Sequence, residues 1–200
     1  MAFIGMRHVV GAVFESHTPG SEPTYESGSG FDVGGAISGN LTINRNTNDL
    51  FYDDHLGESD NGISSMELEL GLDDLLEEIQ AKMGLLKAVS TGSGTSAVTT
   101  YYETSGASKP IGLGYIRVRR KNGATKYQAL WIYKTTFSQN AENAQTKGET
   151  IEWQTPTING KCAGLDTDSS GDYNFRKRQI FDSAAAAEAW LDGLAGITRT

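Results

Sequence analysis

The chain has one cysteine and three histidines in 200 residues, and it has no long apolar run. A single cysteine excludes an intramolecular disulfide framework and a cysteine-rich zinc site. The histidines His8, His17 and His55 lie in three unrelated segments, without the HxH or HxxxH spacing of metal ligands. No stretch approaches the roughly 18 apolar residues of a membrane-spanning helix. The apolar start, Met1–Gly5, is too short for a signal peptide. We therefore expect a soluble protein made in the cytoplasm.

Sequence signatures of catalysis are also missing. The chain contains no GxSxG nucleophile elbow, no phosphate-binding P-loop and no dinucleotide-binding fingerprint. Asp166–Asp172 resembles the start of a calcium loop, but Lys177 stands where a bidentate glutamate is needed, so we interpret the segment as a hairpin turn. Cys162 ends an apolar strand, which favours a buried structural thiol. We expect a protein that is not an enzyme, with no catalytic residue, metal or cofactor.

Glycine is abundant, at 24 residues, whereas the hydrophobic content of 38% is low for a compact globule. Both values fit a chain of short strands, tight turns and long exposed loops, or a subunit that gains stability in an assembly. The length predicts one domain, residues 1–200. Its longest loops are expected at residues 15–30, 53–61 and 88–97.

The net charge of −8 argues against a protein that binds nucleic acid by counterion release. The charges are segregated: residues 49–80 hold eleven acidic side chains and no Lys or Arg, whereas residues 106–141 hold seven basic ones and no acid. Two interpretations stay open, because the segments either neutralise each other within one fold or pair between copies. The candidate inter-subunit contacts are Asp53, Asp54, Glu58, Asp60, Arg117, Arg119, Arg120 and Lys121.

The most regular stretch, Pro110–Cys162, predicts an antiparallel meander at the core of the domain. Its first two runs alternate in polarity around Asn122-Gly123, which is the strongest short hairpin signal because both residues tolerate a positive φ. Gly112 and Gly114 indicate a bulge or a close backbone contact, and Pro156 indicates a strand edge or bulge. The expected strands are Ile111–Arg120, Lys126–Phe137 and Thr150–Cys162.

Outside the meander, the patterns predict further strands, a helix that needs a sheet to cover, and a C-terminal helix. Period-2 alternation predicts strands, and apolar residues at helical spacing predict a helix of about 12 residues at 72–83. Ser183 is a good N-cap for an alanine-rich helix at 183–194. The remaining expected strands are Met6–Phe14, Phe31–Asn44, Leu50–Tyr52, Ile63–Leu70, Val98–Glu103 and Tyr173–Phe181.

Two tracts and the N-terminus carry motifs that occur together. The tract from Leu50 to Met83 contains YDD, an acidic loop, an alternating SMELELG and then LDDLLEEIQAKMG. The second tract, from Pro110, combines an aromatic WxYK strand, a polar loop with TKGxxI and a closing QTPTIxG strand; IGMRHVVGAVF opens the chain. In this order, over well over half of the chain, the motifs resemble the major tail proteins of long, non-contractile-tailed phages of Gram-positive hosts. The Ser/Gly-rich insert after Lys87 and the C-terminal helix depart from the family pattern.

The resemblance implies a tail tube protein, located in the virion tail and assembled in the host cytoplasm. Such proteins have a mainly antiparallel β-sandwich or barrel core flanked by a helix, to which this chain adds its C-terminal helix. They form hexameric rings that stack into a hollow tube around a tape measure protein, with tail-tip and tail-terminator proteins as further partners. DNA passes only transiently through the lumen, and no membrane is involved. The resemblance carries no active site.

An acidic lumen would repel passing DNA, and the candidate lumen-facing carboxylates are Glu67, Glu69 and Glu152. A simple solvated strand face explains the same residues equally well. Two alternatives to a tube subunit remain. One is a distal tail or secretion-tube ring protein, which stops at a single ring. The other is a β-sandwich binding module, for example for host-surface carbohydrate, which requires aromatic side chains exposed on a shallow face.

Overall fold

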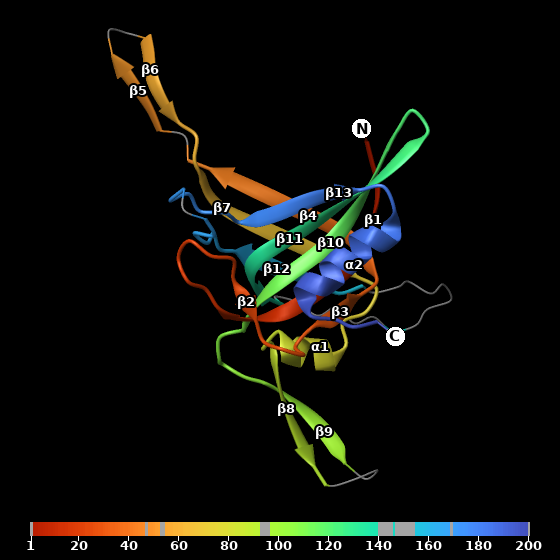
Figure 1. The fold of residues 1–200 in the computed structure, drawn as a ribbon. Helices are drawn as coiled ribbons and strands as arrows, with labels where there is room; N and C mark the ends of the chain where they lie inside the picture. The colour runs from red at the N-terminus through yellow and green to blue at the C-terminus, as the bar shows by residue number, and fades with distance from the viewer. Residues whose placement is uncertain are drawn as a thin grey trace.

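The computed structural model describes residues 2–46, 48–52, 55–92, 97–139, 146, 155–168 and 170–199 (Figure 1). The strands are β1 (Ala2–Ser16), β2 (Thr24–Tyr25), β3 (Phe31–Gly34), β4 (Ala36–Arg45), β5 (Asn48–Tyr52), β6 (His55–Asp60), β7 (Ile63–Leu72), β8 (Leu86–Thr91), β9 (Val98–Glu103), β10 (Pro110–Lys121), β11 (Ala124–Ser138), β12 (Thr157–Cys162) and β13 (Arg176–Phe181). The helices are α1 (Glu77–Lys82) and α2 (Ala184–Ala195).

Nine strands form one antiparallel sheet with the main path β2-β1-β10-β11-β12-β7-β4, in which β3 also pairs with β1 and β13 with β11. The expected meander is confirmed, because β10, β11 and β12 are consecutive neighbours. The long strand β11 forks: residues 127–132 pair with β13, and residues 135–138 pair with β12. The sheet folds back until β4 contacts β1, where Gly39 lies against Met6. The result is a two-layered, mainly antiparallel β structure, as expected.

The larger part of the core lies between the two layers. Alternate residues of β7 point inward, so that Met66, Leu68 and Leu70 are buried while Glu67 and Glu69 are exposed, as the alternation predicts. They pack against the inner faces of β10 and β11, represented by Leu113 and Leu130. Cys162 is buried in this layer, as expected. Burial raises the pKa of its thiol, which keeps it protonated at neutral pH.

A second core lies on the outer face of β1, β10 and β11, under α2 (Figure 1). Alternation predicts one face of β11 with Tyr127, Ala129, Trp131 and Tyr133, and the structure confirms it: this face packs against α2. Because the opposite face of β11 fills the first core, residues 128–133 are buried on both sides. The sheet therefore has one segment that is covered from both sides, which is typical of the centre of a stable fold.

Glycines on β10 make room for the second core. A Cβ at Gly114 would lie 2.7 Å from both Leu191 Cδ2 and Trp131 Cε3, and one at Gly112 would lie 2.4 Å from Tyr25 Cε1. The pairing of β10 with β11 also shifts register between Ile111 and Leu113. Both expected reasons for these glycines, a bulge and a close contact, therefore hold.

The C-terminal helix has the predicted ends. Ser183 is the N-cap in an extended conformation, and its Oγ accepts a hydrogen bond from Ala186 N at 3.2 Å. Gly196, with φ +67°, ends the helix in the left-handed region. The predicted hairpin turn is also confirmed, with Asn122 at φ +51° and Gly123 at φ +80°.

Two expected loops are partly strands, and these predictions were wrong. Residues 55–60 form β6, which pairs with β5, and residues 86–91 form β8, which pairs with β9. β6 and β8 lack apolar alternation, so the hydrophobic pattern did not reveal them, whereas their partners β5 and β9 contain the expected strands Leu50–Tyr52 and Val98–Glu103. Residues 53–54 and 93–96 lie outside the described part of the chain. The expected single strand Phe31–Asn44 is divided into β3 and β4 at Gly35.

The helix expected at 72–83 is only α1, and this prediction was also wrong in extent. Leu72 ends β7, where its N–H donates to Pro156 O at 2.9 Å. The Asp73 and Asp74 carboxylates each accept a hydrogen bond from the next backbone N–H, which favours a turn over a helix start. Pro156 directly precedes β12, in agreement with a strand edge. The earlier part of the third expected strand, residues 147–154, is not described.

Candidate assembly surfaces

Two hairpins leave the body of the molecule at opposite ends (Figure 1). The β5–β6 arm, residues 48–60, is closed at its base by a hydrogen bond from Asn46 N to Gly62 O, and the β8–β9 arm, residues 86–103, starts beyond a bond from Lys109 N to Met83 O. Each arm forms a sheet of its own, separate from the nine-stranded sheet. Isolated two-stranded hairpins are marginal in water, and their outer edges offer unpaired backbone groups. Both arms are therefore suited to contact another molecule.

The loop at residues 15–30 behaves differently from the arms, because it is fastened to the body. Tyr25, in β2, accepts a hydrogen bond from Trp131 Nε1 at 2.8 Å and donates one to Tyr133 O at 2.9 Å. Its ring meets the Trp131 ring edge to face at 5.3 Å between centroids. Burial raises the pKa of Tyr25, and burial together with the Glu22 charge raises the pKa of Tyr133 to about 12. The loop therefore packs over the second core and is not a free arm.

The outer face of β4, β7 and β12 is polar and holds two of the predicted lumen-facing carboxylates. Glu69 lies between Asn40 and Asn159 across the strands, and Glu67 lies between Thr42 and Lys161. A shallow depression of about 260 Å³ runs over this face. The helix α2 packs on the other half of the sheet and leaves this face open (Figure 1). Glu152 lies outside the described residues. The depression is lined by Asn40, Thr42, Glu67, Leu68, Glu69, Thr136, Ser138, Asn159, Gly160 and Lys161.

The predicted basic strand is divided between two faces of the sheet. Arg117 and Arg119 continue the inward alternation of Leu113 and Tyr115, whereas Arg120 follows the opposite face. The four basic residues at 117–121 do not therefore form one continuous surface. The backbone of Lys121 is described but its side chain is not.

Of the predicted acidic contacts, Asp53 and Asp54 lie outside the described residues. Glu58 and Asp60 belong to β6, where only their backbone is described. Within the same arm, the Asp49 carboxylate accepts a hydrogen bond from Ser59 Oγ at 2.6 Å. Five of the eleven acidic residues of segment 49–80 thus belong to an arm that reaches away from the body (Figure 1).

Sequence reasoning missed a charged cluster that ties the C-terminus to the body. His8 has φ +55°, at an irregularity in β1, and its Nε2 lies 2.9 Å from Asp192 Oδ1. Arg199 donates from Nε to Asp192 Oδ2 at 2.7 Å and from a terminal nitrogen to Asp32 Oδ1 at 2.6 Å. Burial opposes ionisation of Asp192, but the hydrogen bonds from Arg199 and His8 outweigh it and lower the pKa of this carboxyl. These residues are far apart in sequence, so no local pattern could reveal the cluster.

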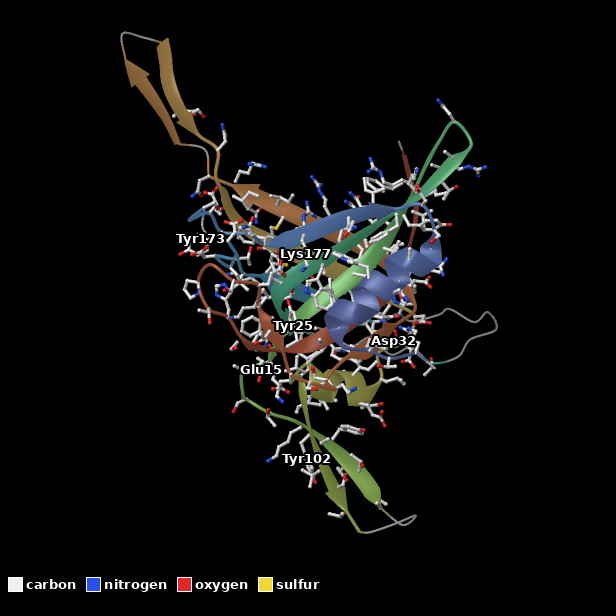
Figure 2. All side chains as sticks on the ribbon, viewed as in Figure 1. Glu15, Tyr25, Asp32, Tyr102, Tyr173 and Lys177 are labelled. Carbon is white, nitrogen blue, oxygen red and sulfur yellow. The ribbon has the colours of Figure 1, made fainter. Side chains whose placement is uncertain are left out.

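The aromatic side chains do not form a shallow binding face in the described parts of the chain. Trp131 is fully buried, Trp190 is half-buried against Phe181, and Trp153 is not described. The exposed Tyr102 and Tyr173 belong to well-separated parts of the molecule (Figure 2). The carbohydrate-binding alternative requires exposed tryptophans, and it stays untested because Trp190 is half-buried and Trp153 is not described.

No helix in the described parts of the chain is long and apolar enough to cross a membrane. The same residues contain no group of three or more His, Cys, Asp or Glu side chains placed to hold a metal ion. In comparisons with known proteins, no family model matches the chain and no curated protein matches it significantly.

Proposed function

We propose that this protein is the subunit of a phage tail tube, which assembles into stacked hexameric rings around a tape measure protein. The observation that carries the proposal is the pair of unpartnered hairpin arms at opposite ends of a closed body (Figure 1). Contacts between two different surfaces generate rings or open tubes, because each copy offers the second surface to the next copy. The resemblance of the meander and of the acidic tract to tail proteins supports the same function.

The polar face of β4, β7 and β12 is our candidate for the wall of the lumen. A conduit for DNA needs a surface that neither packs against protein nor attracts phosphate. Glu67 and Glu69 project from this face, and among the described residues that line its depression Lys161 is the one basic side chain. Carboxylates at this surface repel the DNA backbone and favour free passage. Tail-tip and tail-terminator proteins then meet the two ends of the tube, and DNA contacts the protein only in transit.

Electron microscopy of the purified protein tests this proposal. We expect rings or tubes by negative stain, alone or after addition of tail-tip and tape measure proteins. Assembly that always stops at one ring supports the distal ring alternative. A protein that stays monomeric under all of these conditions contradicts the proposal.

Two deletion variants locate the contacts. One replaces residues 48–60 by a short glycine linker, and the other does the same for residues 86–103. The backbone bonds at the base of each arm, Asn46 N to Gly62 O and Lys109 N to Met83 O, stay in place. We expect both variants to fold as monomers and to lose tube formation. Unimpaired tubes from both variants would show that the arms are not assembly contacts.

A further inference from the structure

Four arginines from two separate strands lie on one face of the sheet. β13 pairs with β11 so that Arg178 lies opposite Leu130 and Arg176 opposite Ile132, both of which point into the first core. Arg117 and Arg119 of β10 share this face, just beyond Tyr115. The strand β13 follows the meander by a long connection, so only the fold brings the four residues together. We call Arg117, Arg119, Arg176 and Arg178 the arginine cluster.

The arginine cluster has no acidic partner within the described part of the chain. The ion pairs there involve other basic residues: Arg7, His8, Lys126, Lys177 and Arg199. Arg117 donates one hydrogen bond, to Gln128 Oε1 at 3.0 Å, and the Nε atoms of Arg117 and Arg119 are enclosed without a described partner. Burial and the charges of Arg117 and Arg178 lower the pKa of Arg176. Enclosed guanidinium groups without carboxylates are costly, so a partner that supplies carboxylates is favoured.

Apolar side chains surround the arginine cluster and extend it into a mixed surface. Phe3, Ile4 and Ile180 are 49%, 58% and 53% exposed. The Phe3 ring lies 4.3 Å from Arg117 Cζ and 5.4 Å from Arg119 Cζ, which holds both guanidinium groups in place. Aromatic residues and arginine are enriched at protein interfaces. The aromatic ring is buried there, and the planar guanidinium group of arginine binds a carboxylate. This surface is suited to an acidic and partly apolar partner.

The β5–β6 arm has that composition. Residues 48–60 contain five acidic residues and no Lys or Arg, and they also include Leu50, Phe51 and Leu56. In its own chain the arm leaves the body at the other side of the molecule from the β10–β11 turn (Figure 1). A hairpin of this length extends by about 17 Å, enough to cross onto a neighbour.

We infer that the β5–β6 arm of one copy docks on the arginine cluster of a second copy. The arm contributes carboxylates to the guanidinium groups and apolar side chains to the rim around Phe3 and Ile180. The contact joins two different surfaces, so it leaves a free arm on one copy and a free cluster on the other, as a ring requires. This inference rests on the proposed function, because it names the surfaces that join neighbouring tube subunits.

A charge-swap experiment tests the pairing. Variant A carries Arg119→Glu and Arg178→Glu, and variant B carries Asp49→Lys and Glu58→Lys. We expect each variant alone to require at least about tenfold more protein for assembly, because like charges then meet at every contact. An equimolar mixture should assemble as the wild type does, since the acidic arm of A meets the wild-type cluster of B and the lysine arm of B meets the glutamates of A. An even-numbered ring accommodates this alternation.

A matched control separates the contact from net charge. Lys82→Glu with Lys109→Glu changes the charge as much as variant A does, but both lysines are exposed at the α1 end of the molecule. We expect this control to assemble normally. Circular dichroism and melting temperature show that the monomers of A and B are folded. If variant A assembles normally, or if the mixture fails to assemble while both proteins are folded, the inference is wrong.

A disulfide cross-link distinguishes failure of the inference from failure of the proposed function. Asp49→Cys with Arg178→Cys places one thiol on the arm and one in the cluster, and the only native cysteine, Cys162, is buried. Oxidation should give a ladder of covalent oligomers on denaturing gels. Tubes without a ladder overturn the inference and leave the proposed function intact. A ladder that ends at one closed ring, together with micrographs that show single rings and no tubes, supports the inference and contradicts a tube. The absence of both tubes and a ladder overturns both.

Nucleic acid is the competing occupant, because phosphate and carboxylate bind guanidinium groups in the same way. Retention of duplex DNA in a gel-shift assay, measured for the wild type and for variant A, addresses it. If variant A loses DNA binding while its assembly is unchanged, the arginine cluster is a nucleic-acid surface and the inference is wrong. We expect no DNA retention by the wild type, given its net charge of −8.

Discussion

The body of the protein and its two arms are both antiparallel β structure, but different interactions stabilise them. In the body, β11 is buried on both faces, with Leu130 and Ile132 in one core and Trp131 in the other. In the β8–β9 arm the six paired positions are mostly exposed, and the side-chain contact across it is a hydroxyl pair, Ser90 with Thr99 at 2.9 Å. Apolar burial stabilises the body, whereas the arm depends on backbone pairing, whose net contribution is small.

This difference shows where the protein is complete and where it needs a partner. Truncation in the body should cost stability and leave the assembly contacts intact, whereas truncation in an arm should cost assembly and leave stability intact. The following changes test the separation, in order of their expected effect on the free energy of unfolding.

The largest effect is expected for Trp131→Ala. The side chain is fully buried between α2 and Tyr25, so its removal leaves a cavity and takes away the hydrogen bond that the Tyr25 hydroxyl accepts. We expect a loss of about 3–5 kcal/mol, measured by urea denaturation. A loss below about 1 kcal/mol would mean that α2 is not part of the stable core.

The next effect is expected for Gly114→Ala, which places a methyl group 2.7 Å from Leu191 and Trp131. Overpacking of this kind costs about 1–3 kcal/mol. Gly193→Ala is the matched control, because it lies in α2 with open space around it and should stabilise the protein by up to about 1 kcal/mol. Equal effects of the two changes would contradict the close packing of α2 on β10.

The charged cluster at the C-terminus should give the fold a dependence on acid. The folded pKa of Asp192 is lowered, so its contribution is complete above its unfolded pKa of about 4 and is lost as pH falls through the folded pKa. We expect Asp192→Asn to cost about 1–2 kcal/mol at pH 7 and to reduce the loss of stability below about pH 4. Denaturation curves of both proteins from pH 7 to pH 2.5 measure this. If both proteins lose the same free energy of unfolding as the pH falls, Asp192 is not the cause.

The smallest effect is expected for Tyr102→Ser in the β8–β9 arm, which is the counterpart of Trp131→Ala. Tyr102 is 52% exposed and lies on an arm outside both cores (Figure 2). We expect its loss to change stability by less than about 0.5 kcal/mol. A larger loss of stability in the isolated monomer would show that the arm packs on the body. It would contradict the conclusion that apolar burial stabilises the body but not the arm.

Local patterns predicted the parts of the fold whose stability is local. The Asn122-Gly123 turn, the alternation of β7 and β11, and the Ser183 cap all appear where the sequence placed them. The helix at 72–83 was predicted too long, because hydrogen bonds within Asp73 and Asp74 and the pairing of Leu72 outweigh the apolar periodicity. One strand of each arm, β5 and β9, was predicted, but the partner strands β6 and β8 were missed, because neither carries the apolar alternation that marks a strand with one buried face.

The sequence by itself determined the antiparallel meander, the C-terminal helix and the separation of acidic from basic segments, since each is written in adjacent residues. Only the tertiary structure decided which side chains share a surface. The pairing of β13 with β11 assembles the arginine cluster. Folding also places the acidic β5–β6 arm on the other side of the molecule from the β10–β11 turn (Figure 1). A local turn sets the register of a hairpin such as β10–β11, but the pairing of strands far apart in the chain is set by packing between them, which no local pattern contains.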